Sequence, residues 1–359
     1  MNMKTVHWTR SESEGSGLPT PEPWTTATPE EVGLDGAALE ALAARIAKGE
    51  LDDIHSLLVV RDGKLAFERY FTGADARWAE PLGTIAFGPE TLHDLRSVTK
   101  SVVGALVGIA HGDGAIPDLD APLASFFPEH AKGREADLAG RTLRHALTMS
   151  AGLAWDELTH PYWDPRNDEN GLWSATDPLE YALSRKPVAP AGARFAYNGG
   201  LPTVLASVVE RATGKPLDVF ARERLLSPLG VTETEWIQHP SGLFVAASGL
   251  RLRPRDIARF GQLMLDGGRF AGRQIVPADY ARESLAPQIA TGMSAVPSYG
   301  YQWWVAHVPI ASGNGGQRIV LDRARRMIVV ITAGLYDSPR QAEAPMRVFE
   351  GVVNAVTGD

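Results

Sequence analysis

Ser97 and Lys100 form the ends of the tetrapeptide Ser97-Val98-Thr99-Lys100 and are the pair best suited to covalent chemistry in this sequence. At the start of a helix, residues three apart lie on one face, so the two side chains can meet. A serine hydroxyl becomes a good nucleophile only when a neighbouring base takes its proton. A lysine can be that base where burial or nearby charge favours its neutral form. The spacing therefore indicates a serine nucleophile; the competing interpretation is an N-cap serine followed by an exposed lysine.

The sequence lacks other familiar catalytic and cofactor motifs. The absence of cysteine excludes disulfides, thiolate metal sites and a cysteine nucleophile. The 9 histidines are scattered, with no HExxH pattern for zinc. Gly214-Lys215 lacks the upstream glycine of a phosphate loop, and Ser150 lacks the preceding glycine of a GxSxG elbow. The acidic stretch 164–170 lacks EF-hand spacing and is expected to be a solvated loop. We therefore expect no metal and no cofactor.

The bulk composition is ordinary for a globular protein of 359 residues, with 44% hydrophobic and 22% charged residues. A formal net charge of −8 argues against nucleic acid or an anionic membrane as the partner. The N-terminus has no apolar core of a signal peptide, and no stretch approaches the roughly 20 apolar residues that span a bilayer. If Met1 is the natural start, these features predict a cytoplasmic protein; they do not indicate its oligomeric state.

The N-terminal quarter of the chain predicts an arm, a helix and a hairpin. Residues 1–27 are rich in Ser, Gly, Pro, Thr and Glu and are expected to be extended or disordered. Thr28-Pro29-Glu30-Glu31 matches a capping box, and a second start at Asp35 predicts a helix up to Lys48. Two β-rich runs in 56–71 flank Asp62-Gly63, which predicts a hairpin with a type I′ turn.

The remaining chain predicts a helical middle and a β-rich end. The apolar run VTKSVVGALVGIA after Ser97 predicts a buried helix, and 155–175 predicts an ordered loop near a surface or cleft. Further helices are expected at 143–148, 178–184, 201–213, 255–265 and 346–356, and strands at 299–307, 317–322 and 327–333.

The N-terminal hairpin and the C-terminal strands can share one antiparallel sheet, which gives an α+β fold. We expect an arm (1–27), an α/β lobe that combines 28–90 with 297–359, and a mostly helical lobe (91–296). The active site is expected at the interface of the two lobes.

The order of motifs along the chain resembles the serine β-lactamase and penicillin-binding-protein superfamily. Within it, the chain is similar to the class C-like branch of esterases and 6-aminohexanoate-dimer hydrolases. The resemblance runs from about residue 30 to the end. These stretches carry it: LLVVRDGKLAFERYF, LRSVTKSVVGALVGIA, TLRHALTMSAGLAWDE, RFAYNGGLPTVLASVVERATGKPL, LLSPLGV, RDIARFGQLMLDGGRFAGRQIVP, and YGYQWWV followed by SGNGGQ. It implies a β-lactamase/transpeptidase-like fold and acyl transfer.

The resemblance also implies roles for individual residues. Ser97 would be the nucleophile, Lys100 its partner, and Tyr197 a base made effective by the positive charge of Lys100. The backbone N–H groups of Ser97 and Gln317 would form the oxyanion hole. Trp155 falls where amide-hydrolysing relatives carry an aromatic residue over the site, so it either caps the substrate or packs in the core.

The glycine-rich third motif adds three tentative substrate-binding residues, Asn314, Gly315 and Gly316. Gly316 would let a strand approach the substrate without a side-chain clash. Asn314 replaces the Lys or His of relatives, so it brings no charge for the carboxylate of a penicillin.

The second motif also departs from the family pattern. Gly199 stands where class C β-lactamases carry Asn, so an amide that would hold the substrate carbonyl is missing unless Asn198 replaces it. The departures at Gly199 and Asn314 leave the expected nucleophile and base intact.

Three functions remain open. The first is a serine hydrolase that cleaves a small ester or linear amide, as carboxylesterases and 6-aminohexanoate-dimer hydrolases do. The second is a D,D-peptidase or β-lactamase, which the two departures disfavour. The third is a catalytically silent ligand-binding protein, which the presence of Ser97, Lys100 and Tyr197 disfavours. For the first function the expected partner is a small ester or amide substrate.

Overall fold

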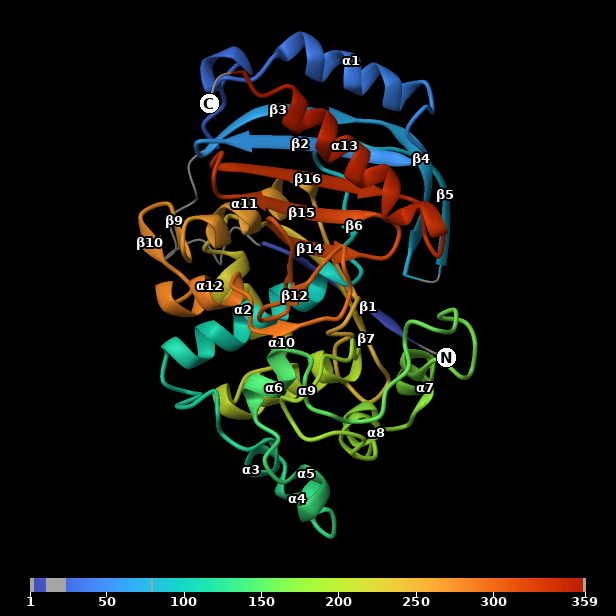
Figure 1. Cartoon of the computed structure of the whole chain (residues 1–359), viewed down its shortest axis with the longest axis vertical. Coiled ribbons are helices and arrows are strands. Elements are labelled where there is room, and N and C mark those ends of the chain that lie inside the picture. Colours follow the sequence, from blue (N-terminus) through green and yellow to red (C-terminus); the bar gives the residue numbers. More distant parts are fainter. Residues whose placement is uncertain (1–2, 11–23, 79, 358–359) are drawn as a thin grey trace.

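The computed structural model describes residues 3–10, 24–78 and 80–357. Its main feature is one large antiparallel sheet in which strands from both ends of the chain lie side by side (Figure 1). The strand order is β11 (Ile289–Ala290), β12 (Ser298–Tyr299), β13 (Trp304–Val305), β14 (Pro309–Gly313), β15 (Gln317–Asp322), β16 (Met327–Ala333), β2 (Ile54–Arg61) and β3 (Lys64–Tyr70). This arrangement confirms the predicted α+β fold.

Strands β2 and β16 are mostly apolar and are buried along nearly their whole length, because both faces of the sheet are covered. Successive side chains point to opposite faces of a strand. In β2, Leu58 and Val60 belong to one core, whereas Leu57 and Val59 belong to the other. The sheet therefore separates two hydrophobic cores.

One of these cores lies under two helices at the ends of the chain. Helices α1 (Gly36–Ala47) and α13 (Glu343–Asn354) pack on this face of the sheet (Figure 1). Asp35 caps α1 by accepting a hydrogen bond from the Ala38 N–H, as expected. The capping box at Thr28 also forms, but it precedes only a 3₁₀ turn (Glu30–Val32).

The other core extends from the sheet into the helical part of the molecule. Helices α2 (Val98–Gly112), α11 (Pro254–Leu265) and α12 (Ala278–Ser284) connect the sheet to this part. The remaining helices are α3 (Leu123–Phe126), α4 (Pro128–Ala131), α5 (Glu135–Leu138), α6 (Leu143–Leu147), α7 (Asp168–Ser174), α8 (Pro178–Leu183), α9 (Gly200–Thr213) and α10 (Leu217–Ala221), followed by a π-helical turn (Arg222–Leu226) and, near the C-terminus, a 3₁₀ turn (Pro339–Gln341). None of the helices in the described ranges has the length and apolar content needed to cross a membrane.

The predicted hairpin and the last two predicted strands are confirmed. Strands β2 and β3 pair across Asp62 and Gly63, whose φ angles of 51° and 76° are those of a type I′ turn. Strands β15 and β16 begin and end at the predicted residues.

The expectation of a single strand over 299–307 is wrong. The chain turns between β12 and β13, where the Gly300 N–H donates to the Trp303 carbonyl at 2.8 Å. Gln302 has a φ of 64° and bonds through its backbone and side chain to the carbonyls of Ala146 and Leu147. Hydrogen bonds to α6 therefore replace sheet pairing here.

A small second sheet was not predicted from the sequence. Its strand order is β1 (Lys4–Thr9), β7 (Glu233–Gln238), β8 (Leu250–Leu252) and β6 (His93–Asp94). Strand β1 lies inside the expected 1–27 arm; it is extended, but it is paired along its length with β7. Its alternate residues Val6 and Trp8 are half-buried, which explains the pairing. Residues 11–23 of the arm lie outside the described residues.

Two short antiparallel pairs complete the strands. They are β4 (Thr72–Arg77) with β5 (Glu80–Ala86), and β9 (Arg269–Phe270) with β10 (Arg273–Gln274).

Candidate active site

Ser97 lies immediately before α2, at its N-cap position, so Lys100 follows within the first turn. The Lys100 side chain is 1% exposed. Its Nζ donates to the Ser97 Oγ at 2.9 Å and to the Ala247 carbonyl at 3.0 Å. The interpretation of Lys100 as an exposed helix lysine is therefore wrong, and the two side chains meet as the spacing predicts.

Tyr197 completes a cluster with these two residues. The Lys100 Nζ lies 4.9 Å from the centre of the Tyr197 ring. The Trp304 ring stacks on Tyr197, with the two ring centres 5.3 Å apart. Burial and the charges of Glu157 and Glu169 hold the pKa of Tyr197 well above its usual range, and the hydrogen bond with Ser97 opposes this shift.

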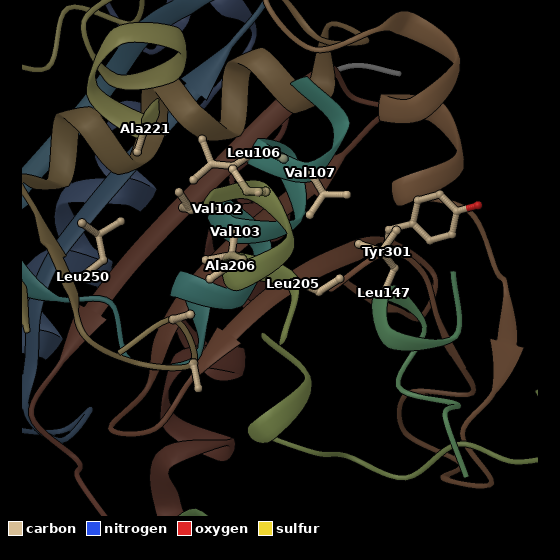
Figure 2. Packing of buried hydrophobic residues seen from close by; sticks show 14 of the residues in the cluster. Val102, Val103, Leu106, Val107, Leu147, Leu205, Ala206, Ala221, Leu250 and Tyr301 are labelled. Atoms are coloured by element: carbon tan, nitrogen blue, oxygen red, sulfur yellow. The ribbon is translucent and has the colours of Figure 1, made fainter. Parts of the chain in front are cut away.

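Packing between two buried helices brings the members of this cluster together. Tyr197 lies three residues before α9, and α9 packs against α2. Figure 2 shows Val102, Val103 and Leu106 of α2 beside Leu205 and Ala206 of α9. Every residue from Val98 to Ala110 is buried, so α2 is held on all sides and its N-terminus is fixed relative to Tyr197.

A pocket of about 530 Å³ opens beside Ser97. Half-buried Ser97 forms part of its wall, and five of the 14 lining residues are aromatic. The other lining residues are Ala76, Trp78, Arg96, Tyr162, Trp163, Glu169, Asn170, Trp173, Ser174, Ser248, Asn314, Tyr336 and Asp337. Such a pocket suits a small organic molecule. Six of these residues belong to the stretch 155–175, which confirms that it lies near a cleft, although Asp168–Ser174 is helix α7 rather than loop.

The pocket holds little positive charge. Arg96 is paired with Asp94 at 3.0 Å and lies over the Tyr336 ring at 4.5 Å. Two carboxylates, Glu169 and Asp337, also line the wall. An anionic group on a ligand would therefore meet a wall that is neutral or negative.

The turn between β14 and β15 brings the third motif to the same region. Gly313 packs directly against the Leu95 carbonyl, just before Ser97. Asn314 follows it in the pocket wall, where its side chain donates to Asp337 at 2.7 Å and accepts from the Asp337 N–H. Gln317, expected as an oxyanion-hole residue, is 1% exposed and is not among the lining residues; its side chain bonds instead to Ala333 of β16.

The two glycines of this motif serve the turn. Gly315 and Gly316 have φ angles of 88° and 100°, which residues other than glycine rarely adopt. A side chain at Gly315 would meet the Tyr336 ring, and one at Gly316 would meet Pro345 and Ala333. Neither glycine lines the pocket, so the structure does not place them against a substrate.

Asn198 and Trp155 also have structural contacts in place of the expected substrate contacts. The Asn198 Oδ1 accepts from the backbone N–H groups of Gly200 and Leu201, at 2.8 and 3.2 Å, and thereby caps the start of α9. Trp155 donates to Glu157 at 2.8 Å and lies against Gly200. Neither side chain lines the pocket.

Two buried carboxyl groups beside the site, those of Glu157 and Glu169, were not predicted from the sequence. They are 3% and 6% exposed and lie in hydrogen-bonding contact with one another. Burial and the negative charge of Glu169 raise the pKa of Glu157 to about 8, whereas the nearby charge of Lys100 lowers it. The only indirect sign of these buried carboxyl groups in the sequence is Gly199, which stands where class C β-lactamases carry the larger side chain of Asn.

The prediction that 164–170 is a solvated loop is wrong for three of its residues. Asp164, Asn167 and Glu169 are buried, at 8%, 0% and 6% exposure. Asn167 Nδ2 donates to the carbonyls of Glu157 and His160, and its Oδ1 caps α7. The polar side chains thus satisfy backbone groups of a folded loop.

One further cluster in the described part of the chain could be considered for a metal. Donor atoms of His55, Asp75 and His93 lie within 4.8 Å of one another. The two imidazoles are hydrogen-bonded at 2.8 Å, closer than two ligands of one zinc ion, and the Arg251 guanidinium is 3.8 Å from Asp75. A hydrogen-bonded polar network therefore fits these residues better than a cation site does.

Comparisons with known proteins agree with this fold. Residues 50–352 match the family model described as Beta-lactamase. The 6-aminohexanoate-dimer hydrolase of Paenarthrobacter ureafaciens is 28% identical over 81% of this chain and 76% of its own. Esterase EstB of Burkholderia gladioli is 30% identical over 57% of this chain, and the match spans about half (51%) of the esterase.

Solved structures show the same likeness of fold. A Bacillus anthracis structure described as a candidate 6-aminohexanoate-dimer hydrolase superposes with a TM-score of 0.76, at 20% identity, over 98% of this chain and 91% of its own. Because the family model covers most of the sequence, the chain belongs to the beta-lactamase family of serine hydrolases.

Proposed function

We propose that this protein hydrolyses a small ester or linear amide through an acyl-enzyme on Ser97. The observation that carries the proposal is the contact between the buried Lys100 Nζ and the Ser97 Oγ, at 2.9 Å, beside a pocket whose wall includes Ser97 and five aromatic residues. A buried lysine in contact with a serine hydroxyl is the arrangement that serine activation requires.

The proposed reaction has two halves. In acylation, the Ser97 Oγ attacks the substrate carbonyl carbon while its proton passes to the Lys100–Tyr197 pair, with Tyr197 as the principal acceptor. That proton then goes to the leaving alcohol or amine, and the carbonyl–oxygen or carbonyl–nitrogen bond breaks. In deacylation, water gives up a proton to the same pair and attacks the ester carbon. The bond from this carbon to the Ser97 Oγ then breaks, the pair returns the proton to Oγ, and the acid is released.

Backbone N–H groups would hold the oxyanion that forms in each half. The Ser97 N–H at the start of α2 is one donor. For the second donor we propose the Asn314 N–H in place of the expected Gln317 N–H, because Asn314 lines the pocket beside Ser97 and Gln317 does not. A single such donor is worth about 3 kcal/mol in comparable oxyanion holes.

The charge of the pocket favours esters and linear amides over penicillins. A penicillin carries a carboxylate close to its reactive carbonyl. The cation nearest Ser97 in the wall, Arg96, is paired with Asp94, and Glu169 and Asp337 add negative charge. Placing a carboxylate there would be unfavourable.

Intact-protein mass spectrometry after brief incubation with p-nitrophenyl esters of different chain length tests the proposal. We expect one acyl adduct on Ser97, none in Ser97→Ala, and an unchanged adduct in the control Ser184→Ala, which replaces an exposed serine at the end of α8. Tyr197→Phe is expected to lower kcat by about 10²-fold. Turnover in Ser97→Ala, or rapid stoichiometric labelling of Ser97 by a fluorescent penicillin, would contradict the proposal.

A further inference from the structure

The two missed carboxyl groups occupy the space in which residue 199 would carry a side chain. A Cβ built on Gly199 would lie 2.9 Å from the Glu157 Oε2 and 3.3 Å from the Glu169 Oε2. Gly199 has a φ of −68°, which any residue can adopt, so the backbone does not require glycine there. The glycine instead provides room for the carboxyl groups.

Glu157 is held by donors from three directions. Its Oε2 accepts from the Trp155 Nε1 at 2.8 Å and from the Gly199 N–H at 2.6 Å. Its Oε1 accepts from the Tyr162 hydroxyl at 3.4 Å. The Gly199 N–H also stands at the N-terminus of α9, where the helix dipole favours a negative charge. These contacts fix the Glu157 carboxyl group in one orientation.

Two buried carboxyl groups in contact repel one another when both are ionised, which favours one proton shared between them over two negative charges. The raised pKa of Glu157 has this cause together with burial. Glu169 uses its Oε1 to accept from Trp173 and Ser248, both at 3.3 Å, and its burial is nearly as complete.

The pair faces the groups to which we assign the proton transfer. Lys100 of α2 interacts with Glu157 through its charge, and Ser248, which bonds to Glu169, follows the Ala247 carbonyl that holds the Lys100 Nζ. The other titratable groups facing the pair are the hydroxyls of Tyr162, Tyr197 and Tyr299. Burial raises the pKa of all three, and the charge of Glu157 adds to each shift.

We propose that Glu157 and Glu169 share one proton and act as positioning residues for the Lys100–Tyr197 base. The missing side chain of Gly199 leaves the space that the two carboxyl groups occupy. With one proton, the pair carries one negative charge opposite the Lys100 ammonium group. When the proton leaves, a second negative charge appears beside Tyr197 and disfavours the phenolate that accepts the Ser97 proton. The acylation rate then stops rising with pH. This inference rests on the proposed function of Ser97, Lys100 and Tyr197.

The test is the pH dependence of acylation, measured as the burst of p-nitrophenolate from p-nitrophenyl butyrate between pH 6 and 10. Ser97→Ala serves as the blank for spontaneous hydrolysis. Because the pKa of Tyr197 lies well above its usual range, its phenolate becomes more populated as the pH rises, and we expect the acylation rate of the wild-type protein to rise up to about pH 8. Above pH 8 we expect the rate to level off, because each further pH unit removes nine-tenths of the protonated pair and cancels the gain in phenolate. Glu157→Gln mimics the protonated carboxyl group and cannot ionise, so its acylation rate is expected to keep rising above pH 8.

Glu210→Gln is the matched control. Glu210 is a mostly buried carboxyl group near the other end of α9, and burial raises its pKa too, but it bonds to the Leu217 N–H, far from Gly199. This variant should keep both the rate and the levelling-off above pH 8 of the wild-type protein. A plateau that persists unchanged in Glu157→Gln overturns the proposal.

Gly199→Ala provides an independent check if Glu157→Gln fails to fold by circular dichroism. Its methyl group would displace the carboxyl groups, and we expect an acylation rate at pH 7 at least about tenfold below that of the wild-type protein, in the range of general-base effects. A wild-type rate and pH profile in this variant would refute the role proposed for Glu157 and Glu169. Failure of the proposed function looks different, because then no acyl adduct forms on Ser97 in any variant.

Discussion

Gly108, in the middle of α2, provides a test in which two physical effects predict opposite signs. Replacing a helix-interior glycine by alanine normally stabilises a protein by about 1 kcal/mol, because alanine has the higher helix propensity. A Cβ at Gly108, however, would lie 2.9 Å from the Tyr280 Cγ and still closer to two other ring atoms. The Tyr280 side chain is 3% exposed and has nowhere to move without disturbing its neighbours.

The size of the loss in Gly108→Ala follows from two contributions. Forcing a methyl group into a packed core costs about 1–3 kcal/mol. Moving the ring also weakens the 2.6 Å hydrogen bond from the Tyr280 hydroxyl to the Gly104 carbonyl, and an unsatisfied buried group costs about 1–3 kcal/mol. After the gain in propensity, we expect a net loss of about 2 kcal/mol or more in unfolding free energy.

Urea denaturation measures this loss, and Gly104→Ala is the matched control one turn earlier. A Cβ at Gly104 would lie 3.2 Å from the Gln302 Cβ and Cγ and 3.3 Å from the Tyr301 carbonyl oxygen, so a shift of a few tenths of an ångström accommodates it. This control is expected to stay within about 1 kcal/mol of the wild-type protein. If Gly108→Ala were more stable than the wild-type protein, helix propensity would outweigh packing, and the close α2–Tyr280 contact would be refuted.

Three further changes probe the site and its surroundings. Burial lowers the pKa of His55 and His93 to about 3. As the pH falls, the two imidazoles therefore bind protons in the unfolded chain before they do so in the folded protein. The stability that the two rings contribute is present above pH 6.5 and falls toward pH 3, by about 2 kcal/mol per ring at pH 5. Imidazole NMR signals that titrate near pH 6.5 in the folded protein would contradict this. Trp304→Leu removes the ring stacked on Tyr197 and is expected to lower kcat about tenfold with little change in KM, as steady-state kinetics would show. Arg318 is buried and donates to the backbone carbonyls of Gly313, Gln317 and Gln341. Arg318→Lys loses the forked guanidinium donors and is expected to lower both kcat and the urea midpoint. If neither changed, the β14–β15 turn would not depend on these hydrogen bonds.

Local patterns in the sequence were sufficient to predict the elements that carry the strongest periodicity. The hairpin β2–β3, helix α2 and strands β15 and β16 follow from apolar runs and one Asp-Gly turn, which depend on near neighbours in sequence. Strand β1 could not be predicted in this way because its partner, β7, lies more than 220 residues later. The break at Gly300 likewise depends on hydrogen bonds to α6, a distant segment.

The residues of the candidate site differ in the same way: some could be predicted from nearby sequence, and others depend on distant segments. Ser97 and Lys100 could be predicted from spacing because one helical turn brings them together. Tyr197 could be predicted only from the resemblance to a family, since the packing of α9 on α2 positions it. Glu157 and Glu169 could not be predicted as buried, because a carboxylate in a polar stretch ordinarily indicates solvent exposure. Their burial depends on an absent side chain, that of Gly199, at least 30 residues further along.

Strand β1 has a practical consequence for handling the protein. It covers one edge of β7, and Arg10 continues the contact by donating its N–H to the Thr232 carbonyl at 2.8 Å. Trimming the first ten residues would leave the backbone groups of β7 open along a half-apolar strand, and such edges recruit strands from other molecules. Shortened versions of the chain should therefore self-associate.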